Sequence, residues 1–244
     1  MNPQNLLERI RDTRARIAAA AVSAGRSVDS ITLLAVSKGQ PPETLRAAAA
    51  AGLTQFGESY LQEGLAKQEA LSGTPPGGAI AGEAALQPPL TWHFIGRLQA
   101  NKTRLIAERF AWVHALDRLK IAQRLSEQRP YHAGALNVCL QVNIAGEQSK
   151  GGVTPEELPV LAPTVAALPR LKLRGLMCIA PLEPDPERQR EWFARLRRLQ
   201  EALNTRGLGL DTLSMGMSAD LEAAVLEGAT CLRVGTALFG PRPE

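Results

Sequence analysis

Cysteine, aromatic residues and long apolar runs are all scarce in this sequence of 244 residues. The three cysteines, Cys139, Cys178 and Cys231, lie far apart, form no CxxC motif and have no histidine at metal-ligand spacing. This predicts buried thiols rather than disulfides or a metal site. No run approaches the roughly 18 apolar residues that a membrane span needs, and the N-terminus has no apolar core of the secretory type. We therefore expect a cytoplasmic protein with no membrane partner.

Blocks of like charge are also missing. The sequence has 28 Lys+Arg against 24 Asp+Glu, a net charge of +4, and the basic residues alternate with acids along predicted helices. In the Arg-rich stretch 191–207, apolar residues recur at helical spacing, which indicates a helix with a buried stripe and a solvated basic face. This distribution gives no reason to expect a nucleic-acid partner.

What the sequence does contain is a regular alternation of short apolar runs with longer stretches of helical periodicity, the pattern of parallel βαβ units. We predict eight strands, at residues 31–37, 54–57, 91–95, 112–116, 137–143, 172–179, 212–215 and 230–234. The clearest predicted helices span residues 42–51, 59–71, 117–128, 155–168, 186–206 and 218–227.

Eight such strands in a chain of this length favour one α/β domain over residues 1–244, a closed (β/α)8 TIM barrel. An extra N-terminal helix is expected within residues 1–26. Residues 72–89 are rich in Gly, Pro and Ala, which predicts a flexible surface loop inserted into the barrel rather than a domain boundary.

Polar residues follow several of the predicted strands, at the end of a barrel where active sites are assembled. Lys38 comes directly after the first strand, so its amine would be partly desolvated at the barrel mouth. Desolvation lowers a lysine pKa and favours Schiff-base chemistry, although a lysine extending to solvent past the strand end fits the same position. Asn143, at the end of the fifth strand, would reach a ligand or satisfy a backbone group at the barrel rim.

The last two strands are followed by a candidate phosphate site. Ser218 begins a predicted helix after a glycine-containing turn, and Gly235 and Thr236 follow the eighth strand, so hydroxyl and backbone N–H groups from two loops could hold a phosphate. Ordinary helix capping and tight glycine packing explain either loop alone equally well. Arg233 would pair with a ring nitrogen, with the phosphate or with a structural carboxylate.

Eight segments, in order and over almost the whole chain, resemble the YggS/PROSC family of pyridoxal-phosphate-binding proteins. They are LLAVSKGQP, QFGESYLQE, WHFIGRLQANK, HALDRLKIAQRL, VNIAGEQSKGGV, LRGLMCIA, LSMGMSADLEAAVLEGAT and LRVGTALFG. The family is similar in fold to the N-terminal barrel of alanine racemase. One departure is FGES, in which Ser59 replaces the asparagine of the family's FGEN.

The resemblance implies a site residue by residue. Lys38 would carry pyridoxal 5'-phosphate as a Schiff base, and Arg233 would face the pyridine nitrogen. The phosphate would be surrounded by Ser214, Ser218, Gly235 and Thr236, with the choice between the two serines left open. Asn143 stays a further candidate for cofactor binding.

The same resemblance raises the question of catalysis. Racemisation needs two acid-base groups, and the racemase takes its second one, a tyrosine, from a further C-terminal domain of the partner subunit. This chain ends at Glu244 soon after its last predicted strand, and neither Tyr60 nor Tyr131 is well placed. An arginine at the pyridine nitrogen also weakens the cofactor as an electron sink.

We therefore expect a monomeric protein of pyridoxal phosphate homeostasis, which binds, stores or delivers the cofactor without robust catalysis. The alternative is a racemase-like enzyme with a site made by the barrel alone. Apo-enzymes that require pyridoxal phosphate are the expected partners. Lys150 is a second amine near the barrel mouth, which would attract the anionic cofactor or simply be solvated.

Overall fold

The computed structural model describes residues 3–72, 89–147 and 151–241. Its strands are β1 (Thr32–Val36), β2 (Gln55–Glu58), β3 (Thr91–Phe94), β4 (Trp112–Leu116), β5 (Leu136–Gln141), β6 (Leu171–Met177), β7 (Thr212–Ser214) and β8 (Cys231–Val234). Its α-helices are α1 (Pro3–Ser23), α2 (Pro42–Ala50), α3 (Leu61–Leu71), α4 (Thr103–Arg109), α5 (Leu119–Gln128), α6 (Leu158–Ala166), α7 (Pro186–Asn204), α8 (Leu221–Leu226) and α9 (Thr236–Phe239). Three 3-10 turns, at Val28–Ser30, Ala100–Lys102 and Tyr131–Ala133, complete the elements.

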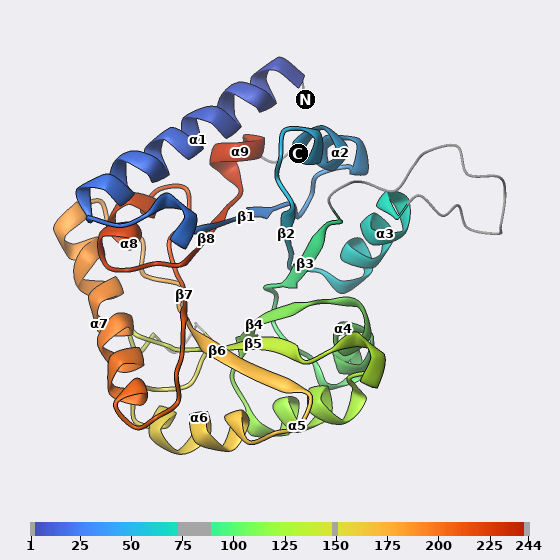
Figure 1. The fold of residues 1–244 in the computed structure, drawn as a ribbon, viewed down its shortest axis with the longest axis vertical. Coiled ribbons are helices and arrows are strands. Elements are labelled where there is room, and N and C mark those ends of the chain that lie inside the picture. Colours follow the sequence, from blue (N-terminus) through green and yellow to red (C-terminus); the bar gives the residue numbers. More distant parts are fainter. Residues whose placement is uncertain (1–2, 73–88, 148–150, 242–244) are drawn as a thin grey trace, which may run out of the picture.

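The strands form a closed parallel barrel in sequence order, so the predicted (β/α)8 architecture is confirmed. β8 returns to β1 with Thr32 opposite Cys231 and Ala35 opposite Val234. In Figure 1 the strands surround the centre and the helices form the outer ring, with α1 lying across the side that carries α8 and α9. Each strand lies within two residues of its predicted bounds. The alternation of apolar runs located the strands because each run is buried by the helices outside it.

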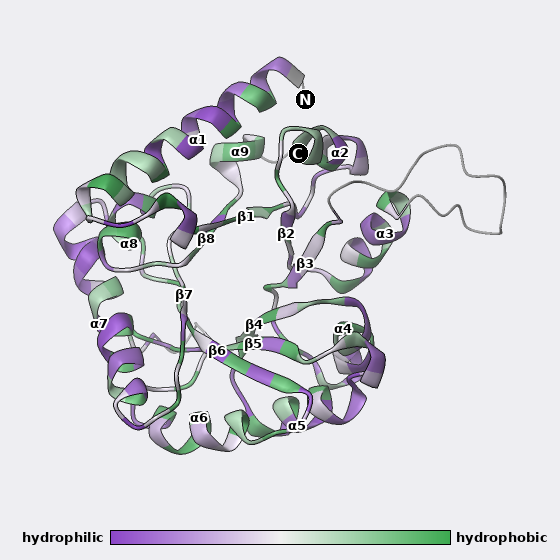
Figure 2. Ribbon diagram, viewed as in Figure 1, coloured by the Kyte–Doolittle hydropathy of each residue, from purple (hydrophilic) through white to green (hydrophobic). Residues whose placement is uncertain are grey.

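The helices bury one apolar face against the barrel. On α7, Phe193, Leu196 and Leu203 are buried, as the helical spacing of residues 191–207 predicts. Figure 2 shows purple and green segments alternating along the helices, as expected for amphipathic elements.

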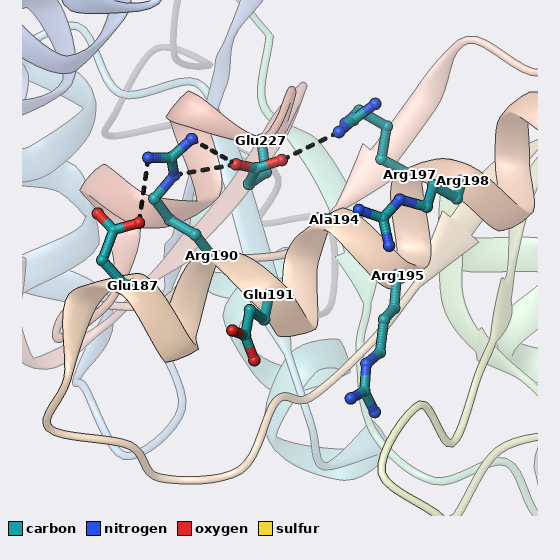
Figure 3. A pocket seen from close by; sticks show the side chains of 8 residues that line it. All are labelled: Glu187, Arg190, Glu191, Ala194, Arg195, Arg197, Arg198 and Glu227. Atoms are coloured by element: carbon teal, nitrogen blue, oxygen red, sulfur yellow. Dashed lines mark hydrogen bonds and ion pairs between the residues drawn. The ribbon is translucent and has the colours of Figure 1, made fainter.

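Two arginines of α7 have a structural role. Glu227, which is 7% exposed at the end of α8, accepts hydrogen bonds from Arg190 Nε at 2.9 Å and Arg197 Nη2 at 3.2 Å (Figure 3). Arg195 instead lies over the ring of Trp192, with its guanidinium carbon 4.3 Å from the ring centroid. Part of the basic face therefore joins α7 to α8.

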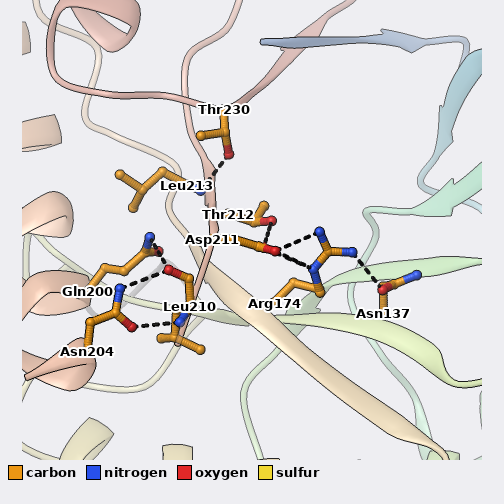
Figure 4. A network of polar contacts seen from close by, with 9 residues as sticks. All are labelled: Asn137, Arg174, Gln200, Asn204, Leu210, Asp211, Thr212, Leu213 and Thr230. Carbon is orange, nitrogen blue, oxygen red and sulfur yellow. Dashed lines mark hydrogen bonds and ion pairs between the residues drawn. The ribbon is translucent and has the colours of Figure 1, made fainter. Parts of the chain in front are cut away.

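A second polar network joins strands at the amino end of the barrel (Figure 4). Arg174 on β6 forms an ion pair with Asp211 at 2.8 Å and donates a hydrogen bond to Asn137 Oδ1 on β5 at 3.0 Å. Asn204 at the end of α7 donates to the carbonyl of Leu210 at 2.8 Å, just before β7. These contacts connect β5, β6 and β7 at the end opposite to the predicted site.

Two predicted helix starts are wrong. α8 begins at Leu221 rather than at Ser218, because the Asp220 carboxylate accepts the N–H of Met217 at 2.5 Å and forms a turn there. α6 begins at Leu158 rather than at residue 155, where Glu157 accepts the N–H of Thr154 at 2.8 Å. In both places a side chain takes the backbone donor that a helix start would leave open.

The N-terminal helix α1 is attached to the loops and helices after β7. Arg16 forms an ion pair with Glu222 at 2.6 Å and donates a hydrogen bond to the carbonyl of Ser218 at 3.1 Å. Arg26, just beyond the helix, donates to the carbonyls of Val225 and Ala229 at 2.9 Å each. The extra helix thus supports the segment that carries Ser218.

Cys139, Cys178 and Cys231 are buried free thiols, as expected. Within the described residues, no group of His, Cys, Asp and Glu is arranged to hold a metal ion, and no helix is long and apolar enough to cross a membrane. Of the predicted flexible loop at 72–89, residues 73–88 lie outside the described part, so its flexibility stays a prediction.

Candidate functional site

A cavity of about 390 Å³ lies at the carboxyl ends of the strands. Its walls come from the loops or strand ends at β1, β2, β3, β6, β7 and β8, which meet there only because the barrel closes. The lining residues are Val36, Lys38, Gln40, Ser59, Ile95, Met177, Ile179, Met217, Ser218, Ala219, Arg233, Gly235, Thr236, Phe239 and Gly240. This is the end of the fold at which (β/α)8 proteins carry their functional sites.

Lys38 lies in the wall of this cavity, in the turn that follows β1. The strand ends at Val36, which also lines the cavity, and Ser37 is buried behind it. Gly39 then adopts φ = +76°, a conformation that favours glycine and turns the chain away from the barrel. The lysine is partly exposed, so its side chain reaches the cavity from a backbone fixed at the barrel rim.

Arg233 brings a positive charge to the floor of the cavity. Arg233 is 6% exposed, and its guanidinium donates hydrogen bonds to the Cys178 carbonyl at 2.7 Å and to Ser214 Oγ at 2.8 Å. Within the described part of the chain no carboxylate forms an ion pair with Arg233. Because arginine keeps its proton in proteins, its charge remains available to an anion or a ring nitrogen in the cavity.

A line of neutral groups continues from Ser214 through the barrel interior. Ser214 Oγ lies 2.8 Å from His114 Nδ1, His114 Nε2 lies 2.9 Å from His93 Nδ1, and His93 Nε2 lies 2.8 Å from Gln55 Oε1. Burial lowers the pKa of His93 to about 3. Burial, with smaller contributions from His93 and Arg233, lowers the pKa of His114 well below its ordinary value. Both rings are therefore neutral at pH 7.

The protons of this line, which we call the histidine chain (Ser214, His114, His93 and Gln55), are assigned from its two ends. Arg233 can only donate to Ser214 Oγ, and the Gln55 carbonyl oxygen can only accept from His93. Each neutral imidazole then carries its proton on Nε2, and Ser214 donates to His114. Each hydrogen-bond donor in the histidine chain therefore points away from Arg233. The Ser214 oxygen, at the near end, accepts from the guanidinium and stabilises it without a carboxylate.

The opposite side of the cavity consists of two loops rich in backbone donors. Ser218 Oγ accepts the N–H of Ala237 at 3.1 Å, which holds the loop after β7 against the loop after β8. Among the described residues, no hydrogen bond has the N–H of Ser218, Ala219, Gly235 or Thr236 as its donor. All four residues line the cavity. Backbone N–H groups gathered in this way form a concave site for an anion.

Residues 14–243 match the family described as "Alanine racemase, N-terminal domain". The chain belongs to this family. Among its relatives, a pyridoxal phosphate homeostasis protein of Pseudomonas aeruginosa is 57% identical over 239 residues, which are 97% of this chain and 96% of the relative. The protein of the same name from Escherichia coli is 46% identical over 238 residues, 98% of this chain and 97% of the relative.

Solved structures of the family agree with the barrel described above. PipY of Synechococcus elongatus, solved with PLP bound, superposes with a TM-score of 0.79 at 35% identity, covering 96% of this chain and all of PipY. An alanine racemase of Clostridium difficile superposes with a TM-score of 0.69 at 14% identity, covering 97% of this chain and 58% of the racemase. The second likeness concerns the fold alone.

Two expected site residues of this family member lie outside the cavity lining. Ser214 is fully buried on β7, below Arg233, and its hydroxyl belongs to the histidine chain. Asn143 follows β5 and donates its amide to the carbonyl of Glu147 at 2.9 Å, while its backbone N–H donates to the Val153 carbonyl. Of the two serines expected at a phosphate, Ser218 therefore lines the cavity and Ser214 does not, while Asn143 makes a contact within the loop after β5.

The other residues considered from the sequence differ in their position relative to the cavity. Ser59 lines the cavity, and its backbone is packed so closely on Gly96 that a Cβ there would lie 2.0 Å from the Ser59 carbonyl oxygen. Tyr60 is 62% exposed and Tyr131 is 87% exposed, and neither lines the cavity. Lys150 lies outside the described residues, so its role stays a prediction.

A charged cluster behind Lys38 was not expected from the sequence. It consists of Glu58 at the end of β2 and of Glu63 and Lys67 on α3, and we call it the Lys67 cluster. Burial raises the pKa of Glu58, against the opposing effect of Lys67. The only signal was the i, i+4 pair of Glu63 and Lys67, which on its own is typical of an exposed helix surface.

Proposed function

We propose that this chain binds pyridoxal 5'-phosphate through Lys38 and takes part in the homeostasis of that cofactor by binding, storing or delivering it. One observation carries the proposal: Lys38, Arg233 and the donor-rich loops at Ser218 and Gly235 line the same cavity. Support also comes from relatives named pyridoxal phosphate homeostasis protein and from PipY, whose structure contains PLP.

The donor set fits the cofactor. When bound, pyridoxal phosphate supplies an aldehyde that condenses with an amine and a phosphate that needs hydrogen-bond donors. Lys38 offers the amine, and the N–H groups of Ser218, Ala219, Gly235 and Thr236 are suitable donors to the phosphate. Gly235 also lets the loop after β8 lie close to the end of β1, since a Cβ at this position would lie 3.3 Å from the Val36 carbonyl oxygen.

The remaining walls suit an aromatic ring. Ile95, Met177 and Ile179 supply apolar surface for ring faces, and Arg233 can donate to a pyridine nitrogen. A guanidinium that keeps its own proton holds such a nitrogen unprotonated. The chain's residues would therefore bind and orient the cofactor while giving little help to carbanion formation.

A racemase-like activity has less support from the site. Among the described residues that line the cavity, Lys38 is the one amine, and none is a histidine, aspartate, glutamate, cysteine or tyrosine. A second acid-base group on the opposite face is required for racemisation. We further propose that the protein acts as a monomer in the cytoplasm and that apo-enzymes requiring pyridoxal phosphate receive the cofactor from it.

The test is covalent attachment at Lys38. Pyridoxal phosphate is added to the purified protein and to Lys38→Ala, each is treated with borohydride, and the modified residue is located by peptide mass spectrometry. Lys120→Ala, which removes an exposed lysine on α5, is the matched control. We expect labelling of Lys38 in the wild type and the control. No labelling in the wild type, or equal labelling in Lys38→Ala at another lysine, would contradict the proposal.

Turnover is tested separately on the loaded protein. We expect no racemisation or transamination above the rate of free pyridoxal phosphate across a panel of amino acids. Turnover that requires Lys38 would instead favour the racemase-like alternative. Transfer is tested by mixing the loaded protein with an apo-enzyme and following recovery of its activity, with Lys38→Ala as the comparison.

A further inference from the structure

The Lys67 cluster is unusual because it places charges in the interior of the protein. Lys67 is 3% exposed and Glu58 is fully buried. The Lys67 ammonium lies 2.7 Å from Glu58 Oε1 and 2.6 Å from Glu63 Oε1. Buried ion pairs seldom stabilise a fold better than well-packed apolar residues would, so they need another explanation.

The cluster holds the main chain on both sides of Lys38. Before it, the carbonyl of Ser37 accepts a hydrogen bond from Lys67 Nζ at 2.6 Å. After it, the N–H of Gly39 donates to Glu63 Oε1 at 2.5 Å. A cation therefore holds the carbonyl on one side and an anion holds the amide on the other, so each interaction is charge-assisted and stronger than a neutral hydrogen bond.

A third contact holds the residue before Lys38 by its side chain. Ser37 Oγ donates to Glu58 Oε1 at 2.6 Å, the same oxygen that accepts from Lys67. The Lys38 turn is thus connected to β2 and α3 as well as to its own strand. Contacts from two other elements are what the rigid placement of a reactive side chain requires.

The helix can reach this turn because it lies very close to β2. A Cβ on Gly64 would lie 3.1 Å from the ring of Phe110 and 3.2 Å from Glu58 Cβ. With glycine there, α3 approaches the strand end, and the side chains one residue before and one turn after this point face the Lys38 turn. Glu63 and Lys67 are these residues.

We propose that Glu63 and Lys67 are positioning residues, which fix the backbone around Lys38 and thereby set the affinity of the chain for pyridoxal phosphate. The expected effect of these residues on affinity rests on the proposed function. Their expected effect on the backbone around Lys38 is independent of any cofactor. The two effects can therefore be measured separately.

The decisive comparison is Glu63→Gln against Glu69→Gln. Both changes remove one negative charge from α3, but Glu69 is exposed. In cofactor-stripped protein, we expect the Gly39 amide to exchange with deuterium about tenfold faster in Glu63→Gln, because it loses a charged acceptor. Glu69→Gln should exchange like the wild type. Unchanged exchange in Glu63→Gln would overturn the backbone part of the inference.

Cofactor binding is then measured by titration with pyridoxal phosphate, following absorbance and the circular dichroism of the bound chromophore. We expect Glu63→Gln to bind about tenfold more weakly and to show a weaker circular dichroism band at saturation, while its thermal unfolding midpoint stays near that of Glu69→Gln. Lys67→Met should show a larger loss of affinity if it folds, and Glu63→Gln decides the matter if it does not.

The outcomes separate the two proposals. If the wild type does not bind pyridoxal phosphate, the proposed function fails and the role in affinity fails with it, while the exchange data still test the contact with Gly39. If exchange at Gly39 accelerates but affinity and circular dichroism stay at wild-type values, the cluster is a structural contact only and the positioning role is wrong.

Discussion

The two basic groups that line the cavity are supported in opposite ways. Behind Lys38 stands the Lys67 cluster, in which charged side chains hold the backbone from outside the barrel. Below Arg233 stands the histidine chain, in which neutral side chains lie in the barrel interior and Ser214 accepts a hydrogen bond from the guanidinium. Each arrangement is largely buried, but only the first contains compensating carboxylates.

The difference decides which charge a ligand meets. The positive charge of Lys67 is matched by two carboxylates and does not compete with Lys38 for an anion. Arg233 instead donates to two neutral acceptors, the Ser214 hydroxyl and the Cys178 carbonyl. Among the described residues no carboxylate compensates its charge. A site for an anionic ring compound gains from both features, a reactive amine of fixed position and an uncompensated cation on the floor.

Removing Lys67 from its cluster should have the largest effect on stability. Lys67→Met leaves Glu58 buried beside an apolar group, so we expect the free energy of unfolding at about pH 7 to fall by about 3 kcal/mol. Urea unfolding measures the change, with the exposed Lys120→Met as control, expected within about 0.5 kcal/mol of the wild type. A loss below about 1 kcal/mol would show that Lys67 is not needed to compensate the buried charge of Glu58.

The histidine chain should make the free energy of unfolding fall at low pH. His93 has a pKa lowered to about 3 by burial, so below its ordinary value of 6.5 the unfolded chain takes up a proton that the folded chain refuses. Stability is then lost as the pH falls, by about 2 kcal/mol at about pH 5 from this ring. His93→Asn should remove that part of the slope in unfolding experiments between about pH 7 and pH 5. An unchanged slope would mean that the ring becomes protonated in the folded protein.

Glu58 should give a slope of the opposite sign. Burial raises its pKa, so the folded chain holds a proton more tightly than the unfolded chain, and stability is lost as the pH rises above the ordinary value. Glu58→Gln removes this contribution. We therefore expect the variant to lose more stability than the wild type on going from about pH 6.5 to pH 4.5, the reverse of His93→Asn. A shallower loss would indicate that Lys67 outweighs burial and holds the pKa of Glu58 below its ordinary value.

These networks also show where sequence reasoning succeeds. The eight strands could be predicted because burial from both faces produces continuous apolar runs, and the residues after those runs gave Lys38, Ser218, Gly235 and Thr236, which the barrel brings to one cavity. The Lys67 cluster could not be predicted, because it depends on how closely α3 approaches β2 at Gly64. The start of α8 was missed because the Asp220 side chain takes the N–H of Met217.

Ser214 and Ser218 lie close in sequence, but their side chains serve different sides of the cavity. Ser214 acts through Arg233, whereas Ser218 lines the cavity beside donors suited to a phosphate. Ser218→Ala should therefore weaken binding of pyridoxal phosphate about fivefold, about 1 kcal/mol, and leave binding of pyridoxal unchanged. Ser214→Ala should weaken both ligands alike, since the guanidinium it orients meets the ring. Titrations of both variants with both ligands make the comparison, and a loss confined to the phosphorylated ligand in Ser214→Ala would reverse the assignment of the two serines.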